Sequence, residues 1–478
     1  MAIVLTNTLS GRKEALRPRQ AGHVRLYWCG VTVYSRAHVG HARFLVTADV
    51  LVRYLLARGL GVTFVRNITD VDDKMIRRAA QEGLTVPELA EREIAAFNRD
   101  VRRLGCLPPT HEPRATAHIP LMIALVERLV AKGLAYPVPD GSVYFRVRRF
   151  PAYGKLSHRR LDDMEAGEEI DAAKEDPHDF ALWKGAKPGE PTWPSPWGPG
   201  RPGWHLECSA MSAHYLGQPF DIHGGGSDLV FPHHENEIAQ SEAGAGMPLA
   251  DLWVHNGMLT FGADKMSKSL GNVLGIAEAT NRFPGEALRL LFFGTHYRAP
   301  LDFGPGRLEE AARVLERLYE SLARADEAAG RAAAPVAPAG ALTGTLSPFL
   351  AEFTAAMDDD LNAAKALGLV HDRVREVNRA LDGGDRTTAA ALRADLARVA
   401  AVLGILAEEP ARFLAALRAG RTARTGLGEA EIAAAIAERN EARRRKDFRR
   451  ADAIREDLRA RGVLLEDTPS GTVWKPAE

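Results

Sequence analysis

A strand, a helix and a second strand follow one another near the start of the chain. Residues 24–33, VRLYWCGVTV, are β-branched and aromatic, which is typical of a short buried strand. Apolar residues then recur at helical spacing from Phe44 to Leu55, and residues 58–62, RGLGV, end that pattern before a second strand-like stretch, VTFVRNI. Because strands joined through a helix pair in parallel, this order predicts an α/β fold with a parallel sheet.

Composition narrows the class of protein further. The chain has 478 residues, which is too long for one ordinary core, so we expect several domains. Lysine plus arginine equals aspartate plus glutamate at 62 each, so a nucleic-acid partner would have to bind a local basic patch. The N-terminal region has no basic leader followed by an apolar core, and no apolar run is long enough to span a membrane, so we expect a cytoplasmic protein.

The pattern changes along the chain in a way that predicts domain boundaries. Residues 121–200 contain a helix, short strands and a turn-rich stretch, which indicates a subdomain inserted into the sheet-forming region. After residue 305 the chain becomes helical and alanine-rich, and residues 439–461 are its most basic stretch. We therefore expect an α/β domain at 1–120 and 201–250, the insertion at 121–200, a region at 251–306 that contains the KMSKS segment, a helical bundle at 307–405 and a C-terminal domain at 406–478.

The segment AHVGHARF, residues 37–44, lies where the first strand gives way to its helix. In a doubly wound sheet this is the position at which unpaired N–H groups bind phosphate. His38 and His41 are three residues apart and can both point at a nucleotide phosphate, while Gly40 lets a flat ring approach the backbone. The same pattern is also typical of a helix cap with incidental histidines.

A second polar segment, DKMSKSLGN, occupies residues 264–272. Its lysines, Lys265 and Lys268, are flanked by serines and followed by glycine, a composition suited to a loop that closes over a polyphosphate. A surface loop is the alternative for this segment alone. Together, HVGH and the later KMSKS resemble the paired signatures of class I aminoacyl-tRNA synthetases.

The heptapeptide FPHHENE, residues 231–237, concentrates two histidines and two carboxylates. On a helix His233 and Glu237 are i, i+4 neighbours, and His234 and Glu237 are i, i+3 neighbours, so either pair can donate two metal ligands. A solvated polar face with a capping histidine is the alternative. The three cysteines cannot form a disulfide framework, and in a reducing compartment cysteine serves metal binding, catalysis or packing.

Five segments narrow the resemblance to cysteinyl-tRNA synthetases: YWCGVTVY, NITDVDDK, GRPGWHLECSAM, DIHGGGSDLVFPHHENEIAQSEA and KMSKSLGN, in this order. The first signature reads HVGH where the commoner form has isoleucine, a change that keeps an apolar, β-branched residue. The resemblance implies a Rossmann-type, doubly wound catalytic domain with an inserted connective subdomain, a 251–306 region that contacts the tRNA stem, a helical bundle, and a small anticodon-binding domain at 406–478.

The same resemblance implies a reaction and a set of site residues. L-cysteine and ATP would give cysteinyl-adenylate and pyrophosphate, and cysteine would pass to the 3′-terminal adenosine of tRNA(Cys), with Mg²⁺ accompanying ATP. One Zn²⁺ per chain would be held by Cys29, Cys208, His233 and Glu237; the resemblance selects His233 where spacing left the choice open. The amino-acid pocket would comprise Gly30, Thr32, Thr69, Trp204, His223 and Asp228. ATP would be bound by His38, Gly40, His41, Lys265, Ser267 and Lys268, of which His38, His41, Lys265 and Lys268 are catalytic.

Two other functions share part of this pattern. Mycothiol cysteine ligases have a similar zinc site, HxGH and KMSKS but lack an anticodon domain, whereas this chain continues to residue 478. A non-catalytic RNA-binding paralogue would have no need of KMSKS. We expect the basic tail to contact tRNA phosphates and Trp474 to stack on a base; a salt-bridged helix and a small core are the alternatives. The arginines concerned are Arg443, Arg444, Arg445, Arg449 and Arg450.

Overall fold

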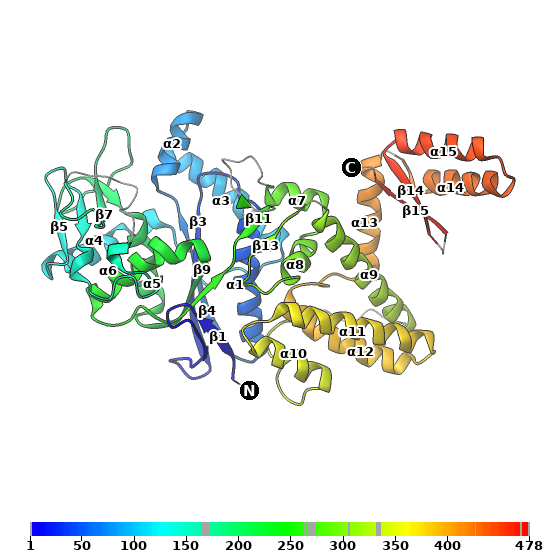
Figure 1. Ribbon diagram of the computed structural model, residues 1–478, viewed down its shortest axis with the longest axis horizontal. Helices are drawn as coiled ribbons and strands as arrows, with labels where there is room; N and C mark the ends of the chain where they lie inside the picture. The colour runs from blue at the N-terminus through cyan, green and yellow to red at the C-terminus, as the bar shows by residue number, and fades with distance from the viewer. Residues whose placement is uncertain are drawn as a thin grey trace. The chain divides into compact units, whose positions relative to one another are not determined.

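The structure is a computed structural model that describes residues 2–163, 173–261, 264–265, 274–304, 306–330, 336–425, 427–468 and 471–476 (Figure 1). The chain divides into two compact units. The larger comprises Met1–Leu315 and Ala334–Ala407, and the smaller comprises Glu316–Ala333 and Glu408–Glu478. Within the described residues, we find no helix with the length and apolar character needed to cross a membrane.

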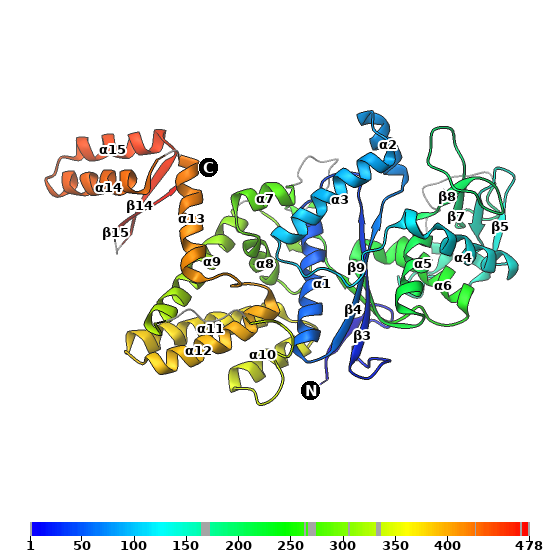
Figure 2. The same cartoon turned by 180° about the vertical axis from the view of Figure 1, so that it is seen from behind.

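A four-stranded parallel sheet forms the centre of the larger unit. Its strands are β3 (His23–Thr32), β4 (Gly61–Thr69), β9 (Phe220–Gly226) and β10 (Ala250–Asn256), in the order β10-β9-β3-β4. Helix α1 (Val39–Ala57) connects β3 to β4 and packs beside the sheet (Figure 2). The predicted strand, helix and second strand are therefore confirmed, and so is the α/β fold with a parallel sheet.

Helices α2 (Asp73–Glu82) and α3 (Val86–Arg103) follow β4. Helix α5 (Trp204–Leu216) leads into β9, and α6 (Glu235–Ala245) connects β9 to β10. Two short turns, η4 (Ser227–Leu229) and η5 (Val230–His234), lie between β9 and α6. Because all four strands run in parallel, the segments that follow β3, β4 and β9 leave the sheet at one edge, where ligand sites of open α/β sheets are found.

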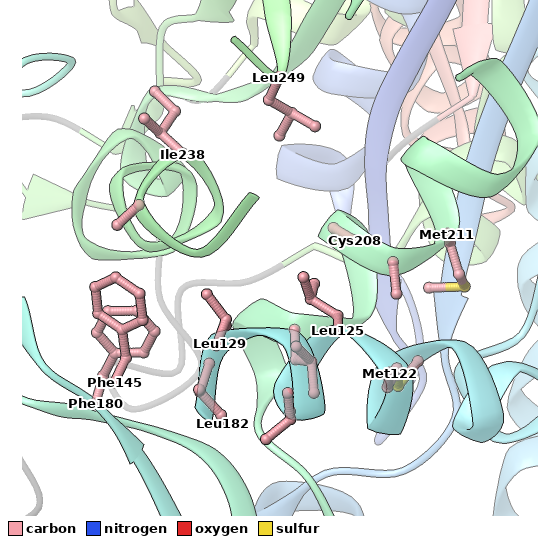
Figure 3. Packing of buried hydrophobic residues seen from close by; sticks show 14 of the residues in the cluster. Met122, Leu125, Leu129, Phe145, Phe180, Leu182, Cys208, Met211, Ile238 and Leu249 are labelled. Atoms are coloured by element: carbon pink, nitrogen blue, oxygen red, sulfur yellow. The ribbon is translucent and has the colours of Figure 1, made fainter. Parts of the chain in front are cut away.

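The segment between α3 and α5 contains a helix, α4 (Ile119–Ala131), and an antiparallel sheet. The strands of that sheet are β5 (Ala135–Pro137), β6 (Val143–Phe145), β7 (Phe180–Gly185) and β8 (Gly200–Pro202). The apolar core beneath this antiparallel sheet extends to the helices beside the central parallel sheet. Residues of α4, β6 and β7 pack there with Cys208 and Met211 of α5 and Ile238 of α6 (Figure 3). The insertion thus shares one apolar cluster with the helices α5 and α6.

The remaining elements of the larger unit are short strands, three short η turns and a group of helices. They are β1 (Val4–Asn7), β2 (Arg12–Ala15), η1 (Ala115–His118), η2 (Val147–Arg149), η3 (Leu161–Asp163), β11 (Leu259–Phe261), β12 (Asp264–Lys265), α7 (Ile276–Arg282), α8 (Gly285–Phe293), β13 (Leu301–Asp302), the first part of α9 (Arg307–Ala328), α10 (Pro348–Asp358), α11 (Ala363–Asp382) and α12 (Arg386–Leu403). Strand β11 pairs with both β12 and β13.

A buried ion pair fixes the helices of the larger unit to α1. The Arg289 guanidinium of α8 donates to the Asp49 carboxylate of α1 at 2.6 Å and to the Leu403 carbonyl of α12 at 2.8 Å. Gly404 follows with φ of +64°, and a Cβ atom there would lie 2.3 Å from the Arg289 Nη2. Position 404, where the chain turns after α12 beside the guanidinium, therefore requires glycine.

The smaller unit is mainly helical and ends in a hairpin. It contains α13 (Pro410–Thr425), α14 (Glu429–Arg444), α15 (Phe448–Ala460) and the antiparallel strands β14 (Val463–Thr468) and β15 (Gly471–Pro476). Its small core comprises Leu427, Ile432, Ile454, Leu458 and Val463, with Trp474 packed against it. Trp474 therefore takes the alternative role named above, as part of a small core.

Candidate active site

Four side chains from four elements converge beneath the edge of the central sheet. They are Cys29 of β3, Cys208 of α5, His233 of η5 and Glu237 of α6, all buried, with one ligand atom of each within 4.8 Å of all the others. The Cys29 and Cys208 sulfurs are 3.6 Å apart, and the Cys29 sulfur is 3.5 Å from the Glu237 Oε1 atom. Both cysteines are free, so two thiols, an imidazole and a carboxylate face one point.

The polar residues of FPHHENE face two different sites: His233 and Glu237 face the cysteines, and Glu235 and Asn236 bind the segment around residues 153–157. His233 and Glu237 are i, i+4 neighbours whose Nε2 and Oε1 atoms are 3.0 Å apart, and both face the two cysteines. Glu235 instead accepts hydrogen bonds from the backbone N–H groups of Gly154 at 2.9 Å and Ser157 at 2.8 Å. Asn236 accepts from the Tyr153 hydroxyl. Because all the polar side chains from 233 to 237 are buried, the solvated polar face is excluded.

His234 belongs to a second possible ligand set, Cys29, His223, His234 and Glu237. Its Nε2 atom is 3.2 Å from the Cys29 sulfur, and its Nδ1 atom is 2.7 Å from the His255 Nε2 atom. Burial, and then the neighbouring imidazoles, hold the pKa of His234 well below its usual value. His233 and His234 thus both reach the cluster. The geometry therefore does not decide which of the two histidines is the metal ligand.

The pKa values of Cys208, His233 and Glu237, three members of the set with Cys29, are shifted toward the ionised forms. Burial alone would raise the pKa of Glu237, but His223 and His233 lower it to about 2. Burial would lower the pKa of His233, but the Glu237 carboxylate raises it to about 10. Burial would likewise raise the pKa of the Cys208 thiol, but hydrogen bonds from Cys29 and His233 lower it to about 6. The Glu237 carboxylate and the Cys208 thiolate can thus coordinate a cation, whereas burial raises the pKa of the Cys29 thiol well above its usual value, and His233 must lose a proton before it can coordinate.

The predicted amino-acid pocket residues lie around this cluster and at the same sheet edge. Trp204 begins α5, is 37% exposed, and stacks on the His233 ring at 4.1 Å between centroids. His223 is buried, with its Nε2 atom 2.9 Å from the Glu237 Oε2 atom. Trp204 and His223 therefore contact two of the candidate ligands directly.

The other pocket candidates lie on the strand ends. Gly30 follows Cys29, and a Cβ atom there would lie 1.7 Å from the Asn67 carbonyl oxygen, so only glycine fits. Thr32 and Thr69 pair across β3 and β4 at the last position of each strand. Asp228 lies in η4, just beyond β9, where it is exposed. The structure thus places these four candidates at one edge of the sheet, and Asp228 is the most solvent-accessible of them.

Residues that sequence reasoning did not select complete the surroundings. The His205 Nδ1 atom is 2.9 Å from the His233 Nδ1 atom, which fixes the ring whose other nitrogen faces Glu237. Glu207 is buried and accepts a hydrogen bond from the Thr69 hydroxyl at 2.7 Å. Both residues lie within the quoted GRPGWHLECSAM segment, so proximity to Cys208 was the available signal.

The HVGH residues form the start of α1. His38 is the N-cap and accepts from the Gly40 N–H at 3.1 Å, while the His41 Nδ1 atom accepts from the His38 N–H at 3.1 Å. The two rings are 3.9 Å apart. A cavity of about 400 Å³ opens beside His38 and is lined by Ser35, Arg36, Ala37, His38, Arg78, Arg92, Glu93 and Gly275. Capping and the predicted nucleotide binding are compatible, since the cap places both rings at the helix N-terminus.

The second signature is largely outside the described residues. Lys265 lies in β12, whose backbone pairs with Thr260 of β11. Ser267 and Lys268 lie outside the described residues. Their predicted contacts with ATP therefore stay predictions.

The basic surface of the smaller unit carries both exposed arginines and ion pairs. Arg443 pairs with Asp467, Arg444 and Arg445 with Glu441, and Arg450 with Glu438. Arg449 is exposed, and the adjacent Phe448 is 61% exposed at the start of α15. This surface is a salt-bridged helix pair, and its exposed aromatic residue is Phe448 instead of Trp474.

Comparison with known proteins places these features in one family. The chain matches the models described as tRNA synthetases class I (C) catalytic domain over residues 15–313, DALR domain over 352–407, and cysteinyl-tRNA ligase anticodon binding domain over 426–474. It is 52% identical over 487 residues to the cysteine–tRNA ligase of Geobacter sulfurreducens, covering 99% of this chain and 100% of that protein. It is 51% identical over 471 residues to that of Alkalilimnicola ehrlichii, covering 98% of each.

Solved structures of other class I enzymes share the fold. A Mycobacterium tuberculosis methionyl-tRNA synthetase bound to methionyl-adenylate has a TM-score of 0.56 at 17% identity, covering 80% of this chain and 89% of that one. A leucyl-tRNA synthetase of Agrobacterium radiobacter in a ternary complex with tRNA has a TM-score of 0.59 at 12% identity, covering 84% and 86%. With its catalytic, DALR and anticodon-binding segments in family order, the chain belongs to the cysteine–tRNA ligases, among the class I aminoacyl-tRNA synthetases.

Proposed function

We propose that the chain activates L-cysteine with ATP, releases pyrophosphate, and transfers cysteine from the adenylate to the 3′-terminal adenosine of tRNA(Cys). Full-length identity of 52% and 51% to proteins named cysteine–tRNA ligase supports this activity. The observation that carries it is the buried group of Cys29, Cys208, His233 and Glu237 beneath the edge of the parallel sheet.

The donor set of this group fits Zn²⁺. In a tetrahedral site with zinc–sulfur bonds near 2.3 Å and shorter zinc–nitrogen and zinc–oxygen bonds, neighbouring ligand atoms lie about 3.3–3.8 Å apart. The separations of 3.6 Å between the sulfurs and 3.5 Å between Cys29 and Glu237 fall in that range, whereas the 3.0 Å between the His233 Nε2 and Glu237 Oε1 atoms is shorter. We assign one Zn²⁺ per chain to Cys29, Cys208, His233 and Glu237, because this set has two sulfur donors whereas the alternative with His223 and His234 has one.

Zinc bound there would stabilise a thiolate far better than a hydroxyl group, which would favour cysteine over serine as the amino-acid substrate. The chain's own residues would shape the rest of the pocket. The Trp204 ring, partly exposed and stacked on His233, can cover the bound amino acid. Gly30, Thr32, Thr69, His223 and Asp228 complete the proposed pocket. Discrimination of this kind is needed because an apolar pocket separates substrates that differ by one small group by only about 1–3 kcal/mol.

The nucleotide would bind at the start of α1. His38, Gly40 and His41 lie at the helix N-terminus, where the helix dipole and the two imidazole rings favour phosphate. Lys265, Ser267 and Lys268 would close over the phosphates, with Mg²⁺ accompanying ATP. Lys268 would neutralise the charge that develops as pyrophosphate leaves, so it would act in the transition state more than in substrate binding.

The smaller unit would bind the anticodon region of the tRNA. The exposed side chains of Arg444, Arg445 and Arg449 can neutralise phosphates, and the 61% exposed Phe448 ring offers a face on which a base can stack. The proposal includes the predicted domains. These are the catalytic domain at 1–120 and 201–250, the connective subdomain at 121–200, the region that contacts the tRNA stem at 251–306, the helical bundle at 307–405 and the anticodon-binding domain at 406–478.

Two assays on the full chain test the proposed function. The first follows exchange of pyrophosphate into ATP, which should depend on L-cysteine and should not be supported by L-serine. The second follows attachment of cysteine to tRNA(Cys), which reversing the charge of Arg444 and Arg449 together should weaken at physiological salt. Exchange without tRNA charging would favour the amino-sugar ligase. Binding of tRNA without cysteine-dependent exchange would favour a non-catalytic RNA-binding protein.

A further inference from the structure

A buried arginine on α1 has no acidic partner. Arg43 lies two residues after His41 and is only 1% exposed. Among the described residues no carboxylate raises the pKa of its guanidinium, which burial lowers to about 10, so the group stays charged at neutral pH. Because arginine is rarely buried without a partner, other polar groups must compensate its charge.

The groups that surround this guanidinium are backbone carbonyls from two separate segments of the chain. The Arg43 Nη1 atom donates to the Met258 carbonyl at 2.7 Å, and its Nη2 atom donates to the Ala299 carbonyl at 2.5 Å. Longer contacts of Nη2 reach the carbonyls of Tyr297 at 3.3 Å and His296 at 3.5 Å. One planar group thus binds both segments at the same time.

These two segments lead into neighbouring strands. Met258 directly precedes β11, and Ala299 precedes β13 by two residues. Because β11 and β13 are parallel neighbours, Arg43 holds both strands at the same end. The two backbones are close there, since a Cβ atom at Gly257 would lie 2.4 Å from the Ala299 carbonyl oxygen. The guanidinium therefore fixes the start of the sheet formed by β11, β12 and β13 against α1.

The same sheet carries one of the lysines proposed to act on ATP. Lys265 lies in β12, and its backbone pairs with Thr260 of β11. Further along the chain, the Val39 N–H at the start of α1 donates to the Leu274 carbonyl at 3.0 Å. Helix α1 thus holds the chain before Lys265, through Arg43, and again after it, at Leu274.

We infer that Arg43 is a positioning residue for the activation of cysteine: its guanidinium holds β11 and β13 against α1 and thereby sets the position of Lys265 relative to the nucleotide. This inference rests on the proposed function, since it assumes that ATP binds at the start of α1 and that Lys265 acts on it. Arg43 acts only through the sheet, because backbone carbonyls occupy its guanidinium. A displacement of about 1 Å in a reacting site can cost about 10²-fold in rate, so a looser hold should slow activation.

The test compares the full-length wild type with Arg43→Lys in cysteine-dependent pyrophosphate exchange, well below the melting temperature of both proteins. Lysine keeps the charge, but its ammonium group lacks the planar fork that binds two segments. The kcat should fall about 10-fold to 100-fold, while the KM for cysteine and the zinc content stay at wild-type values. A purely structural role would lower the melting temperature and leave the kcat of the folded protein unchanged.

A second readout asks whether Arg43 acts through Lys265. In a Lys265→Ala background, Arg43→Lys should change kcat by less than about 2-fold, because the group that it positions is already absent. If the two losses multiply instead, Arg43 does not act through Lys265, and the inference is overturned.

Arg53→Lys is the matched control. Arg53 lies on the same helix with its side chain 12% exposed, and it also donates to two carbonyls, those of Gly105 at 2.8 Å and Ala401 at 3.1 Å. Neither carbonyl belongs to the segments that lead into β11 and β13. This variant should lower the melting temperature while leaving kcat unchanged.

Gly257→Ala tests the same contact from the other side, because its Cβ atom would push against the Ala299 carbonyl. It should reproduce the loss of kcat at an unchanged KM for cysteine. Should Arg43→Lys fail to fold, Gly257→Ala decides the question, and a wild-type kcat in that variant would refute the role of Arg43.

The outcomes separate this inference from the proposed function. A wild-type kcat in Arg43→Lys, together with slow exchange in Lys265→Ala, would overturn the role of Arg43 alone. A wild-type kcat in Lys265→Ala would overturn the proposed role of that lysine together with this inference. A wild type without cysteine-dependent exchange would overturn the proposed function and the inference with it.

Discussion

The carboxylate of Glu235 should hold the inserted subdomain against α6. Its Oε1 atom accepts from the Gly154 N–H at 2.9 Å, and its Oε2 atom accepts from the Ser157 N–H and hydroxyl, both at 2.8 Å. Glutamine has the same shape, but its NH₂ group would have to face one of these donors. Glu235→Gln therefore leaves at least one buried N–H without an acceptor and removes the charge from the remaining bonds.

The size of the effect follows from these contacts. Hydrogen bonds to a charged group contribute about 1.5–3 kcal/mol each, and an unsatisfied buried group costs about 1–3 kcal/mol. Since the bonds share one carboxylate and are not additive, we expect Glu235→Gln to destabilise the docked turn by about 2–4 kcal/mol in total. At about 1.4 kcal/mol for each factor of ten, amide hydrogen exchange at Gly154 and Ser157 should accelerate on the order of 10²-fold.

Hydrogen exchange resolved to residues 150–160 measures this directly, with Glu242→Gln as the control. Glu242 lies on the same helix and pairs with Lys155 of the same turn at 2.6 Å, but both side chains are partly exposed. Its removal should cost less than about 1 kcal/mol and change the exchange rates less than 10-fold. Equal exchange rates in the two variants would refute the assignment of Glu235 as the anchor.

Two further stability predictions follow from ion pairs of the larger unit. Burial would raise the pKa of Asp73, but Lys184 and Arg201 lower it to about 2, so its ionised form stabilises the protein above about pH 4 and that stabilisation is lost as pH falls toward 2. The Asp73 side chain is 37% exposed, so we expect a modest effect. The unfolding free energies of wild type and Asp73→Asn should differ by about 1 kcal/mol at pH 5, and this difference should vanish toward pH 2. A difference that does not change with pH in denaturant titrations would contradict this prediction. Arg289→Met should cost about 3–5 kcal/mol, and less when combined with Asp49→Asn than the sum of the two changes; additive effects in urea unfolding would show that the pair is not coupled.

The parallel sheet was predictable because its signal is local. Residues 24–33 and 62–68 are strand-like by composition, and the helical spacing between them leaves one common way to connect parallel strands. The same holds for helix α1, because the position of its N-cap His38 after a strand indicates a helix N-terminus. The structure adds that His38 and His41 form a reciprocal cap, which their three-residue spacing permits.

The division of labour in FPHHENE was not predictable from spacing. Residues i+3 and i+4 share a helix face, so His233 and His234 were equivalent candidates beside Glu237. The direction of each ring depends on η5 and on contacts with His205 and His255 from distant parts of the chain. Spacing gave no role to Glu235, because its partners Gly154 and Ser157 lie some 80 positions earlier in the chain.

In the C-terminal domain, sequence reasoning selected a different aromatic residue from the one that the structure exposes. Trp474 was expected to stack on a base because large aromatic side chains in basic segments often bind RNA, but it packs on the core of the hairpin and helices. Phe448 is the exposed aromatic residue there, and nothing in its immediate sequence distinguishes an exposed ring from a buried one. Burial of a single aromatic residue depends on the tertiary partners that reach it.

The most direct test of the account measures zinc content and cysteine activation in the same preparations. We expect the wild type to contain one Zn²⁺ per chain and to catalyse cysteine-dependent pyrophosphate exchange. Cys29→Ser and Cys208→Ser should lose both together, because each removes a sulfur donor of the buried cluster. Cys106→Ala should lose neither, because Cys106 lies outside that cluster, 3.8 Å from the Arg289 guanidinium. Full zinc retention and unchanged exchange in Cys29→Ser and Cys208→Ser would contradict the central claim.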